Sequence, residues 1–323
     1  MLWLNLVSNK LKETYRMYTI NDLIEETGNQ PRAVRLAFID FKVRFSGRIY
    51  RTEIVDEFGV SEPLATKDLN EYKQLTQQNN IHPKSHQIKL DTYSPLVAID
   101  ARKALEMHFE GFCRHKLHNQ ESPYYKRACD LKTDLDPDAV AVITRAITDK
   151  KRVVGEYISA NSHNRNIRTL EPSTVFFDGL NWVFRAKDIK EAPHLSIFKS
   201  FHFSRFESIT HTNDDSLSSL NDDSEWNTLI PIQLSLHPNL DDKGKEAIRI
   251  EFGMGNNDDL VVVEKAVFAW SLLERWAVDS GTTPCSVPTE ANRFNFYLKN
   301  ADMLRHVNSV ERMMHDYVIK TEI

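Results

Sequence analysis

The stretch FGVSEPLATKDLNEY, residues 58–72, joins two predicted helices through a tight turn. Gly59 suits the position just after a helix, where the backbone is often left-handed. Ser61 is placed to cap the next helix, and Pro63 falls in its first turn, where a missing N–H costs nothing. The inner side of that helix is apolar and carries Leu64, Leu69, Tyr72 and Leu75.

Two more helices are predicted before this turn. A four-three-four spacing places one side of a helix from Pro31 to about Phe45 on Val34, Phe38, Phe41 and Phe45. A shorter helix spans roughly Glu53 to Phe58. Three helices separated by tight turns predict a helix-turn-helix unit. The following IHPKSHQIKL, residues 81–90, holds two short β-prone runs around Lys84 and Ser85, the outline of a hairpin wing.

The outward side of the third helix carries groups suited to DNA. Thr66, Asn70 and Lys73 place a hydroxyl, an amide and an ammonium on one face, and such groups read base edges and bind phosphates. Arg48 and Arg51 lie near the start of the preceding helix, where free backbone N–H groups also favour phosphate binding. We expect DNA contacts from Arg48, Arg51, Ser61, Thr66, Lys67, Asn70, Lys73, Lys84 and His86. The alternative is a plain three-helix scaffold whose lysines are merely solvated.

The net charge of −5 and the isoelectric point near 6.2 give the whole chain no basic signature for nucleic acid or membranes. Residues 31–95, however, hold ten Lys and Arg against eight Asp and Glu, a net charge of +2. The charge is therefore unevenly distributed along the chain, and the local balance leaves DNA binding open.

Composition predicts a soluble, reduced, cytoplasmic protein. A length of 323 residues is sufficient for two or three cores. A composition of 41% hydrophobic and 27% charged residues is typical of a globular protein. No stretch approaches the roughly 18 apolar residues of a membrane span, and the amino terminus predicts a helix or extension rather than a signal peptide. The three cysteines form no CxxC motif.

The middle of the chain changes from helices to strands. Residues 96–133 are expected to be helical and connective, and a short helix follows Pro137. Several closely spaced strands then predict a small β-barrel or sandwich: VVGEYIS, TVFF, NWVFRA, IFKSFHF and RFESIT. The acidic residues 213–225 form the clearest linker.

The last part of the chain alternates strands and helices. IPIQLSL and LVVV are expected to be strands, with a helix from Leu240 to Phe252 between them and another from about Glu264 to Val278. This order predicts a third compact domain of α+β type. The overall expectation is a multidomain α+β protein.

Catalytic and metal-binding patterns are missing from the sequence. The spacing of His108, Cys113, His115 and His118 fits no standard zinc site. GMGNNDD, residues 253–259, lacks the third glycine of a dinucleotide-binding loop. We therefore expect no cofactor, no metal and no enzymatic activity.

Four short pieces of the strand-rich region occur in an order that resembles a known domain. They are Tyr157-Ile158-Ser159, the Arg168 to Pro172 spacing, Trp182-Val183-Phe184, and Phe203-Ser204-Arg205-Phe206. The stretch from Val153 to Ile209 thereby resembles the WYL domain, a small Sm-like (SH3-like) β-barrel of bacterial transcriptional regulators. Val183 and Phe184 replace the Tyr-Leu pair of the family's name, so a Tyr hydroxyl is missing there.

The flanking segments extend this resemblance. Residues 58–72 look like the winged helix-turn-helix of WYL regulators that accompany BREX and CBASS phage-defence islands, and LHPNLDDKGKEAIRIEFGM resembles their carboxy-terminal extension. The domains implied are an N-terminal extension with winged helix-turn-helix at 1–95, a helical linker at 96–133, the WYL barrel at 134–212, the acidic linker at 213–225, and a C-terminal dimerisation domain at 226–323.

The resemblance implies a homodimeric repressor that binds an inverted repeat in double-stranded DNA and senses an effector in its barrel. Carried over by position, the effector-binding residues are Tyr157, Ser159, Arg168 and Arg205, with Arg185 as a further candidate. Arginines and hydroxyls suit an anion such as a nucleotide or single-stranded nucleic acid, and a tyrosine can stack a base.

Two alternatives remain open from the sequence. The arginines of the barrel can instead close it through internal ion pairs with Glu156, Glu171 or Asp188. The chain can also be a sensing module for single-stranded nucleic acid or a cyclic nucleotide that represses nothing. The sequence does not decide between repression and activation.

Overall fold

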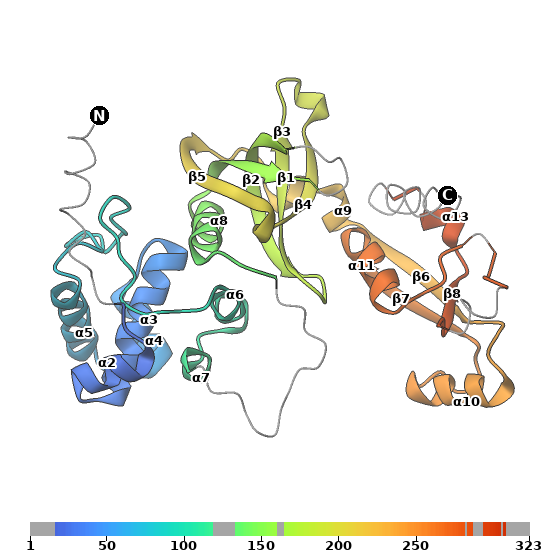
Figure 1. The fold of residues 1–323 in the computed structure, drawn as a ribbon, viewed down its shortest axis with the longest axis horizontal. Helices are drawn as coiled ribbons and strands as arrows, with labels where there is room; N and C mark the ends of the chain where they lie inside the picture. The colour runs from blue at the N-terminus through green and yellow to red at the C-terminus, as the bar shows by residue number, and fades with distance from the viewer. Residues whose placement is uncertain are drawn as a thin grey trace, which may run out of the picture. The chain divides into compact units, whose positions relative to one another are not determined.

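A computed structural model describes residues 17–118, 133–159, 165–281, 283–286, 293–304 and 306–307 (Figure 1). The chain divides into two compact units: the first runs to residue 217, except for residues 177–181, which group with the second. Within the described ranges, no helix has the length and apolar character needed to cross a membrane. The division into five segments expected from the sequence stays a prediction.

The first unit begins with the predicted helical bundle. Asn29 accepts a hydrogen bond from the backbone N–H of Arg32 and so caps the second of its helices. Gly59 has the left-handed backbone that was expected at the end of the third helix, with φ of 62°. Ser61 is the N-cap residue of the fourth, as expected, although its side chain makes no capping hydrogen bond. The helices are α2 (Ile20–Thr27), α3 (Gln30–Ser46), α4 (Arg51–Phe58) and α5 (Glu62–Leu75).

The predicted wing follows α5 as a hairpin of isolated bridges. Ile81 pairs with Ile88, and Gln87 pairs with Arg48 in front of α4. The backbone N–H of His82 also donates to the carbonyl of Gln87 at 2.8 Å. The wing is thereby connected to the start of the helix-turn-helix as well as to the end of α5.

A buried carboxylate links these elements. Asp40 of α3 is 1% exposed. Its side chain accepts hydrogen bonds from the hydroxyls of Tyr72 at 2.8 Å and Tyr93 at 3.1 Å. It also accepts from the backbone N–H groups of Leu96 and Val97, both at 3.0 Å. Burial raises the pKa of Asp40, although these four donors stabilise its charge. One side chain thus holds α3, α5 and the chain beyond the wing together.

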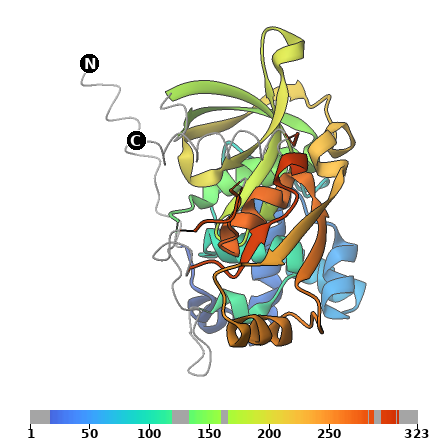
Figure 2. The same cartoon turned by 90° about the vertical axis from the view of Figure 1, so that its right-hand side faces the viewer.

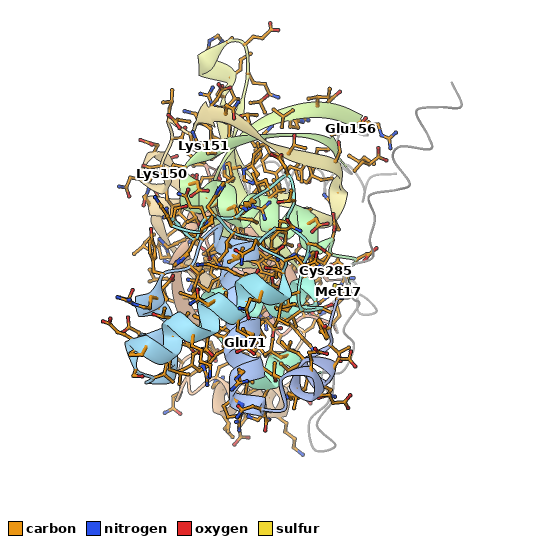
Figure 3. All side chains as sticks on the ribbon, turned by 90° about the vertical axis from the view of Figure 1, so that its left-hand side faces the viewer. Met17, Glu71, Lys150, Lys151, Glu156 and Cys285 are labelled. Atoms are coloured by element: carbon orange, nitrogen blue, oxygen red, sulfur yellow. The ribbon has the colours of Figure 1, made fainter. Side chains whose placement is uncertain are left out.

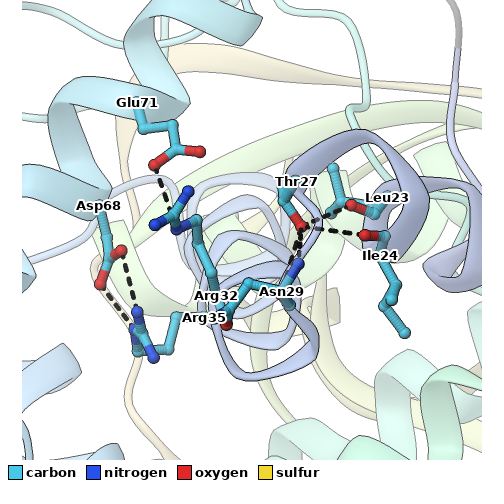
Figure 4. A network of polar contacts seen from close by, with 8 residues as sticks. All are labelled: Leu23, Ile24, Thr27, Asn29, Arg32, Arg35, Asp68 and Glu71. Carbon is cyan, nitrogen blue, oxygen red and sulfur yellow. Dashed lines mark hydrogen bonds and ion pairs between the residues drawn. The ribbon is translucent and has the colours of Figure 1, made fainter.

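Two ion pairs also hold α5 against α3 (Figure 4). The guanidinium of Arg35 donates to both carboxylate oxygens of Asp68, at 2.6 and 3.2 Å, and both side chains are buried. Arg32 lies 3.7 Å from the carboxylate of Glu71 one turn later. Two-pronged arginine–carboxylate contacts restrict orientation as well as distance, so the angle between the two helices is tightly defined.

A five-stranded antiparallel sheet forms the rest of the first unit, in the order β4-β3-β2-β1-β5. The predicted barrel is wrong because β4 and β5 are the two edges of this sheet, which stays open over the described residues. The first half of β2 was missed because its sequence is polar, yet Leu170 pairs with Val153 of β1. The strands are β1 (Lys151–Ile158), β2 (Arg165–Phe177), β3 (Trp182–Ile189), β4 (Ile197–His202) and β5 (Phe206–Asp215).

The helices and the sheet of this unit share one hydrophobic core, which extends from Ile20 in α2 to Phe203 after β4. Three helices connect the two parts: α6 (Ala101–Glu110), α7 (Arg114–Leu117) and α8 (Pro137–Asp149). Helix α8 contacts α3 on one side and β1 and β5 on the other (Figure 1). The winged helix and the sheet are therefore packed together rather than strung on a free linker.

The second unit is a small α+β domain with its own core (Figure 2). Its antiparallel sheet has the order β7-β6-β8. The helix predicted from Glu264 is wrong at its start, because Glu264 pairs with Ile230 and continues the strand. The elements are β6 (Leu229–Leu236), α10 (Asp242–Glu251), β7 (Asp259–Lys265), α11 (Ala269–Arg275), β8 (Phe296–Leu298) and α13 (Ala301–Leu304).

The acidic segment 213–225 is only partly the linker that its composition predicts. Strand β5 continues to Asp215, and Asp223 is 1% exposed. Asp223 accepts a hydrogen bond from the backbone N–H of Trp226 and caps the short helix α9 (Ser224–Asn227). Asp215 at the end of β5 and Asp223 at the start of α9 therefore belong to regular elements rather than to a free linker.

Replacing Asp40 by alanine should strongly destabilise the first unit, because four buried donors lose their acceptor. We expect a loss of about 3 kcal/mol or more in the free energy of unfolding, measured by urea denaturation. Asp91→Ala, at an exposed position of the same unit, is the control and should change little. An equally small effect for both variants would contradict the role given to Asp40.

Candidate nucleic-acid interface

The outer face of α5 carries exposed polar side chains. Lys67 and Asn70 are exposed and have no hydrogen-bond or ion-pair partner within the described part of the chain. The hydroxyl of Thr66 donates to the carbonyl of Glu62 at 2.9 Å, which leaves its oxygen able to accept. Gln74 lies one turn after Asn70 on the same exposed face and was missed, although the spacing of four could have found it. Figure 3, where Glu71 marks α5, shows side chains directed away from this helix.

The two arginines before α5 are engaged within the protein. Arg51 opens α4 and its Nη2 lies 2.9 Å from a carboxylate oxygen of Glu62, with both side chains about half exposed or more. The guanidinium of Arg48 lies over the ring of Tyr50, 5.7 Å from its centre. Both can still approach a phosphate, but Glu62 offsets the charge of Arg51.

The wing brings Lys73 and His86 together and separates them from Lys84. The ammonium of Lys73 donates to the carbonyl of Pro83 at 3.2 Å and lies 3.3 Å from Nε2 of His86. Lys84 is exposed and, among the described residues, has no partner. It borders an open hollow of about 440 Å³, whose other lining residues are His82, Pro83, Ser85 and Gln87.

In the five-stranded sheet, Arg168 belongs to a cluster around a buried carboxylate. Its Nη1 donates to Oδ2 of Asp188 at 2.9 Å, and the Asp188 side chain is fully buried. Two further ammonium groups reach the same carboxylate, from Lys190 at 3.0 Å and from Lys199 at 3.4 Å. Three cations therefore face one anion. Along β3, every second residue points to the same face: Trp182, Phe184, Ala186 and Asp188. This alternation in the sequence could have predicted that the carboxylate of Asp188 is buried.

The structure places the other expected effector residues at separate positions in the sheet and its turns. Tyr157 is 6% exposed, and its ring packs against Phe201 and Phe206 with centroid distances of 5.2 and 4.8 Å. Arg185 is buried three residues before Asp188, so strand alternation places it on the opposite face of β3, where its Nη1 contacts Ser200 at 3.4 Å. Ser159 follows β1, and Arg205 lies in the turn between β4 and β5. Of the five residues, Arg185 therefore lies on the opposite face of the sheet from the Asp188 cluster, and Ser159 and Arg205 lie outside the strands.

Helices α3 and α8 meet through two buried arginines. Nη2 of Arg44 lies 2.8 Å from the carboxylate of Asp138, and Nη1 of Arg145 donates to the carbonyl of Arg44 at 2.6 Å. On β5, the buried Nε2 of His211 has no hydrogen-bond partner in the described ranges. Burial and the nearby charge of Arg145 lower the pKa of His211 to about 4. We call the contacts of Arg44 and Arg145 the joint. Through α8, this joint connects α3, on which α5 packs, to the five-stranded sheet that contains Arg168.

Two family models match the first unit. The BrxR transcriptional regulator winged helix-turn-helix domain matches residues 32–95, and the WYL domain matches residues 138–211. The chain therefore carries a BrxR-type winged helix-turn-helix domain followed by a WYL domain, as the resemblance implied.

Curated relatives support the same assignment. A DNA-binding transcriptional repressor CapW of Escherichia coli (strain KTE188) is 28% identical over 253 residues, which cover 74% of this chain and 81% of that protein. CapW repressors of Pseudomonas aeruginosa and Stenotrophomonas maltophilia are 27% and 25% identical, with the same coverage.

One solved structure aligns with this chain at low similarity. The proteasome accessory factor B/C (PafBC) of Arthrobacter aurescens covers 77% of this chain at 12% identity, with a TM-score of 0.24. This chain spans about half of that protein, 51%.

The lowered pKa of His211 predicts a stability that falls with acid. The neutral imidazole is favoured in the folded state, so its contribution is complete above about pH 6.5 and is lost as the pH falls toward 4. His211→Gln should reduce the loss of unfolding free energy between pH 7 and pH 4.5, measured by urea denaturation. His194→Gln, at an exposed site, is the control. An identical pH profile for His211→Gln and wild type would contradict this assignment.

Proposed function

We propose that this chain, with its BrxR-type winged helix-turn-helix and WYL domains, is a sequence-specific transcriptional repressor of a phage-defence operon. The observation that carries the proposal is the unpartnered pair of Lys67 and Asn70 on the exposed face of α5. An ammonium and an amide in this position suit phosphate binding and base reading in a major groove. The names of the CapW relatives, which call them DNA-binding transcriptional repressors, support it.

The remaining contacts with DNA follow from the same surface. Thr66, Arg48, Arg51 and Ser61 flank the exposed pair on or near α5, and Lys84 extends the surface onto the wing. Glu62 neutralises part of the charge of Arg51, so we assign Arg51 a weaker share of phosphate binding. The positive balance of residues 31–95 supports this footprint.

We infer that the repressor acts as a homodimer on an inverted repeat. A two-fold dimer places two recognition helices on one face of the duplex, about one helical turn apart. The second unit, with its separate core, is the part of the chain that we assign to dimerisation.

An anionic effector is the proposed signal for derepression. Arg168, Lys190 and Lys199 exceed the charge of Asp188, and this excess favours a nucleotide or a single-stranded nucleic acid. Tyr157, Ser159, Arg185 and Arg205 were expected at this site by position. The buried ring of Tyr157 and the opposite-facing Arg185 favour a smaller site around Arg168. The joint at Arg44 and Arg145 is the proposed route from this site to α3.

The alternative function, a nucleic-acid or nucleotide sensor without a repressor role, predicts tight binding of single-stranded probes and no preference among duplexes. Regulation of this kind requires no reaction, and we propose that the chain is not an enzyme. Titration of the full chain against its own upstream DNA and against random duplex separates the two functions. Equal affinity for both duplexes would exclude a specific repressor.

Lys67→Ala should weaken operator binding and reduce its salt dependence. A lost phosphate contact lowers the slope of log affinity against log salt by about 0.9. Fluorescence anisotropy at several salt concentrations measures both quantities. Lys103→Ala, on a helix outside the proposed footprint, is the control, and an effect as large as that of Lys67→Ala would contradict the placement of DNA on α5.

Arg168→Ala should leave operator affinity almost unchanged but impair release. Competition with cyclic dinucleotides, linear nucleotides and single-stranded oligonucleotides identifies a releasing probe for wild type. Without Arg168, about tenfold more of that probe should be required, the scale of one charge-assisted hydrogen bond. Arg165→Ala, an exposed arginine of the same sheet, should behave like wild type. A loss of operator affinity equal to that of Lys67→Ala would refute the division of roles.

A further inference from the structure

We propose that Lys73 and His86 are positioning residues that clasp the wing to the recognition helix α5, rather than contacts to DNA. This inference rests on the proposed DNA-binding function but reverses the role that the sequence predicts for both residues. The clasp would hold Lys84 of the wing and Lys67 of α5 on a single rigid surface.

The geometry of Lys73 directs its ammonium toward the wing. Lys73 lies in the last turn of α5 and is half-buried, whereas Lys67 and Asn70 are exposed. Its Nζ donates to the carbonyl of Pro83 at 3.2 Å and lies 3.3 Å from Nε2 of His86. Two of its three donor positions are therefore directed at the wing.

His86 is held in a conformation that serves this contact. Its backbone is left-handed, with φ of 54°, which is uncommon for a residue other than glycine. Its N–H donates to the carbonyl of His82 at 3.0 Å, and its own carbonyl accepts from Ile49 at 3.3 Å. An ammonium can only donate, so Nε2 of His86 accepts from Lys73 and the ring is neutral. Burial and the charge of Lys73 lower the pKa of His86, which agrees with this assignment.

A second lysine fastens the base of the wing in the same manner. The ammonium of Lys89 donates to the carbonyl of Gln78 at 2.7 Å, just after α5. Gln78 is itself left-handed, with φ of 64°. The wing is thus tied to the end of α5 at its tip by Lys73 and at its base by Lys89, and Lys84 is left without a partner among the residues described.

The salt dependence of operator binding distinguishes a clasp from a phosphate contact. Lys73→Met should lower affinity by about fivefold, the scale of ordering one or two side chains, but should leave the salt slope unchanged. Lys67→Ala and Lys84→Ala are matched controls whose slopes should each fall by about 0.9. A fall of that size for Lys73→Met would overturn the proposal.

Conservative and paired variants test the contact itself. Lys73→Gln keeps an N–H donor without the charge, so it should bind more tightly than Lys73→Met; equal weakness would indicate that the charge acts on DNA. Adding His86→Asn, which tolerates the left-handed backbone, should have less effect in Lys73→Met than in wild type. Additive losses would contradict a shared contact.

A measurement without DNA separates this inference from the proposed function. Amide hydrogen exchange of the free full chain should be faster in Lys73→Met at His82 and His86, whose N–H groups are hydrogen-bonded within the wing, and at Ile88, whose N–H donates to the carbonyl of Gly47. Unchanged exchange would overturn the clasp. If wild type binds no duplex DNA while exchange still rises, the proposed function fails and the clasp stands.

Discussion

The hydrogen bonds of the buried Asp40 carboxylate are the interactions on which the structure of the winged helix-turn-helix domain depends. A charged group removed from water is stable only when its lone pairs are occupied. Tyr72 and Tyr93 supply two of the required donors and the backbone at Leu96 and Val97 supplies two more. Because the donors come from α5 and from the chain after the wing, satisfying one carboxylate fixes three segments at once. The Arg35–Asp68 pair then sets the angle of α5 on α3.

Local chemistry made the first helices predictable and long-range pairing did not. Gly59, Pro63 and the phenylalanine spacing of α3 act within a few residues, so α3 to α5 begin and end near their expected positions. The polar start of β2 and the strand assignment of Glu264 depend on partners far along the chain. Closure of the barrel likewise depends on an edge-to-edge pairing that local patterns do not encode.

The candidate site was predictable by residue type but not by role. Lysines and arginines mark a basic surface, yet a sequence does not show which charges are already paired. Lys67 stays exposed, whereas Arg51 pairs with Glu62 and Arg168 with Asp188. Strand alternation places Arg185 and Asp188 on opposite faces of β3. Applied to the sequence, the same rule would have separated Arg185 from Asp188, and so from the cluster that contains Arg168. The contact between Lys73 and His86 needed the folded wing, because 13 positions separate the two residues.

The continuous core from α2 to the end of β4 has a consequence for how the winged helix-turn-helix domain could be exchanged for another. Where domains are independent modules, a DNA reader can be exchanged by cutting the chain between them. Here α3 packs against both α5 and α8. A replacement winged helix-turn-helix domain must therefore have a surface that packs against α8. Under the proposed function, operator preference changes most easily through exposed side chains of α5, whereas exchange of the whole winged helix-turn-helix requires co-adaptation at the buried Arg44 and Arg145.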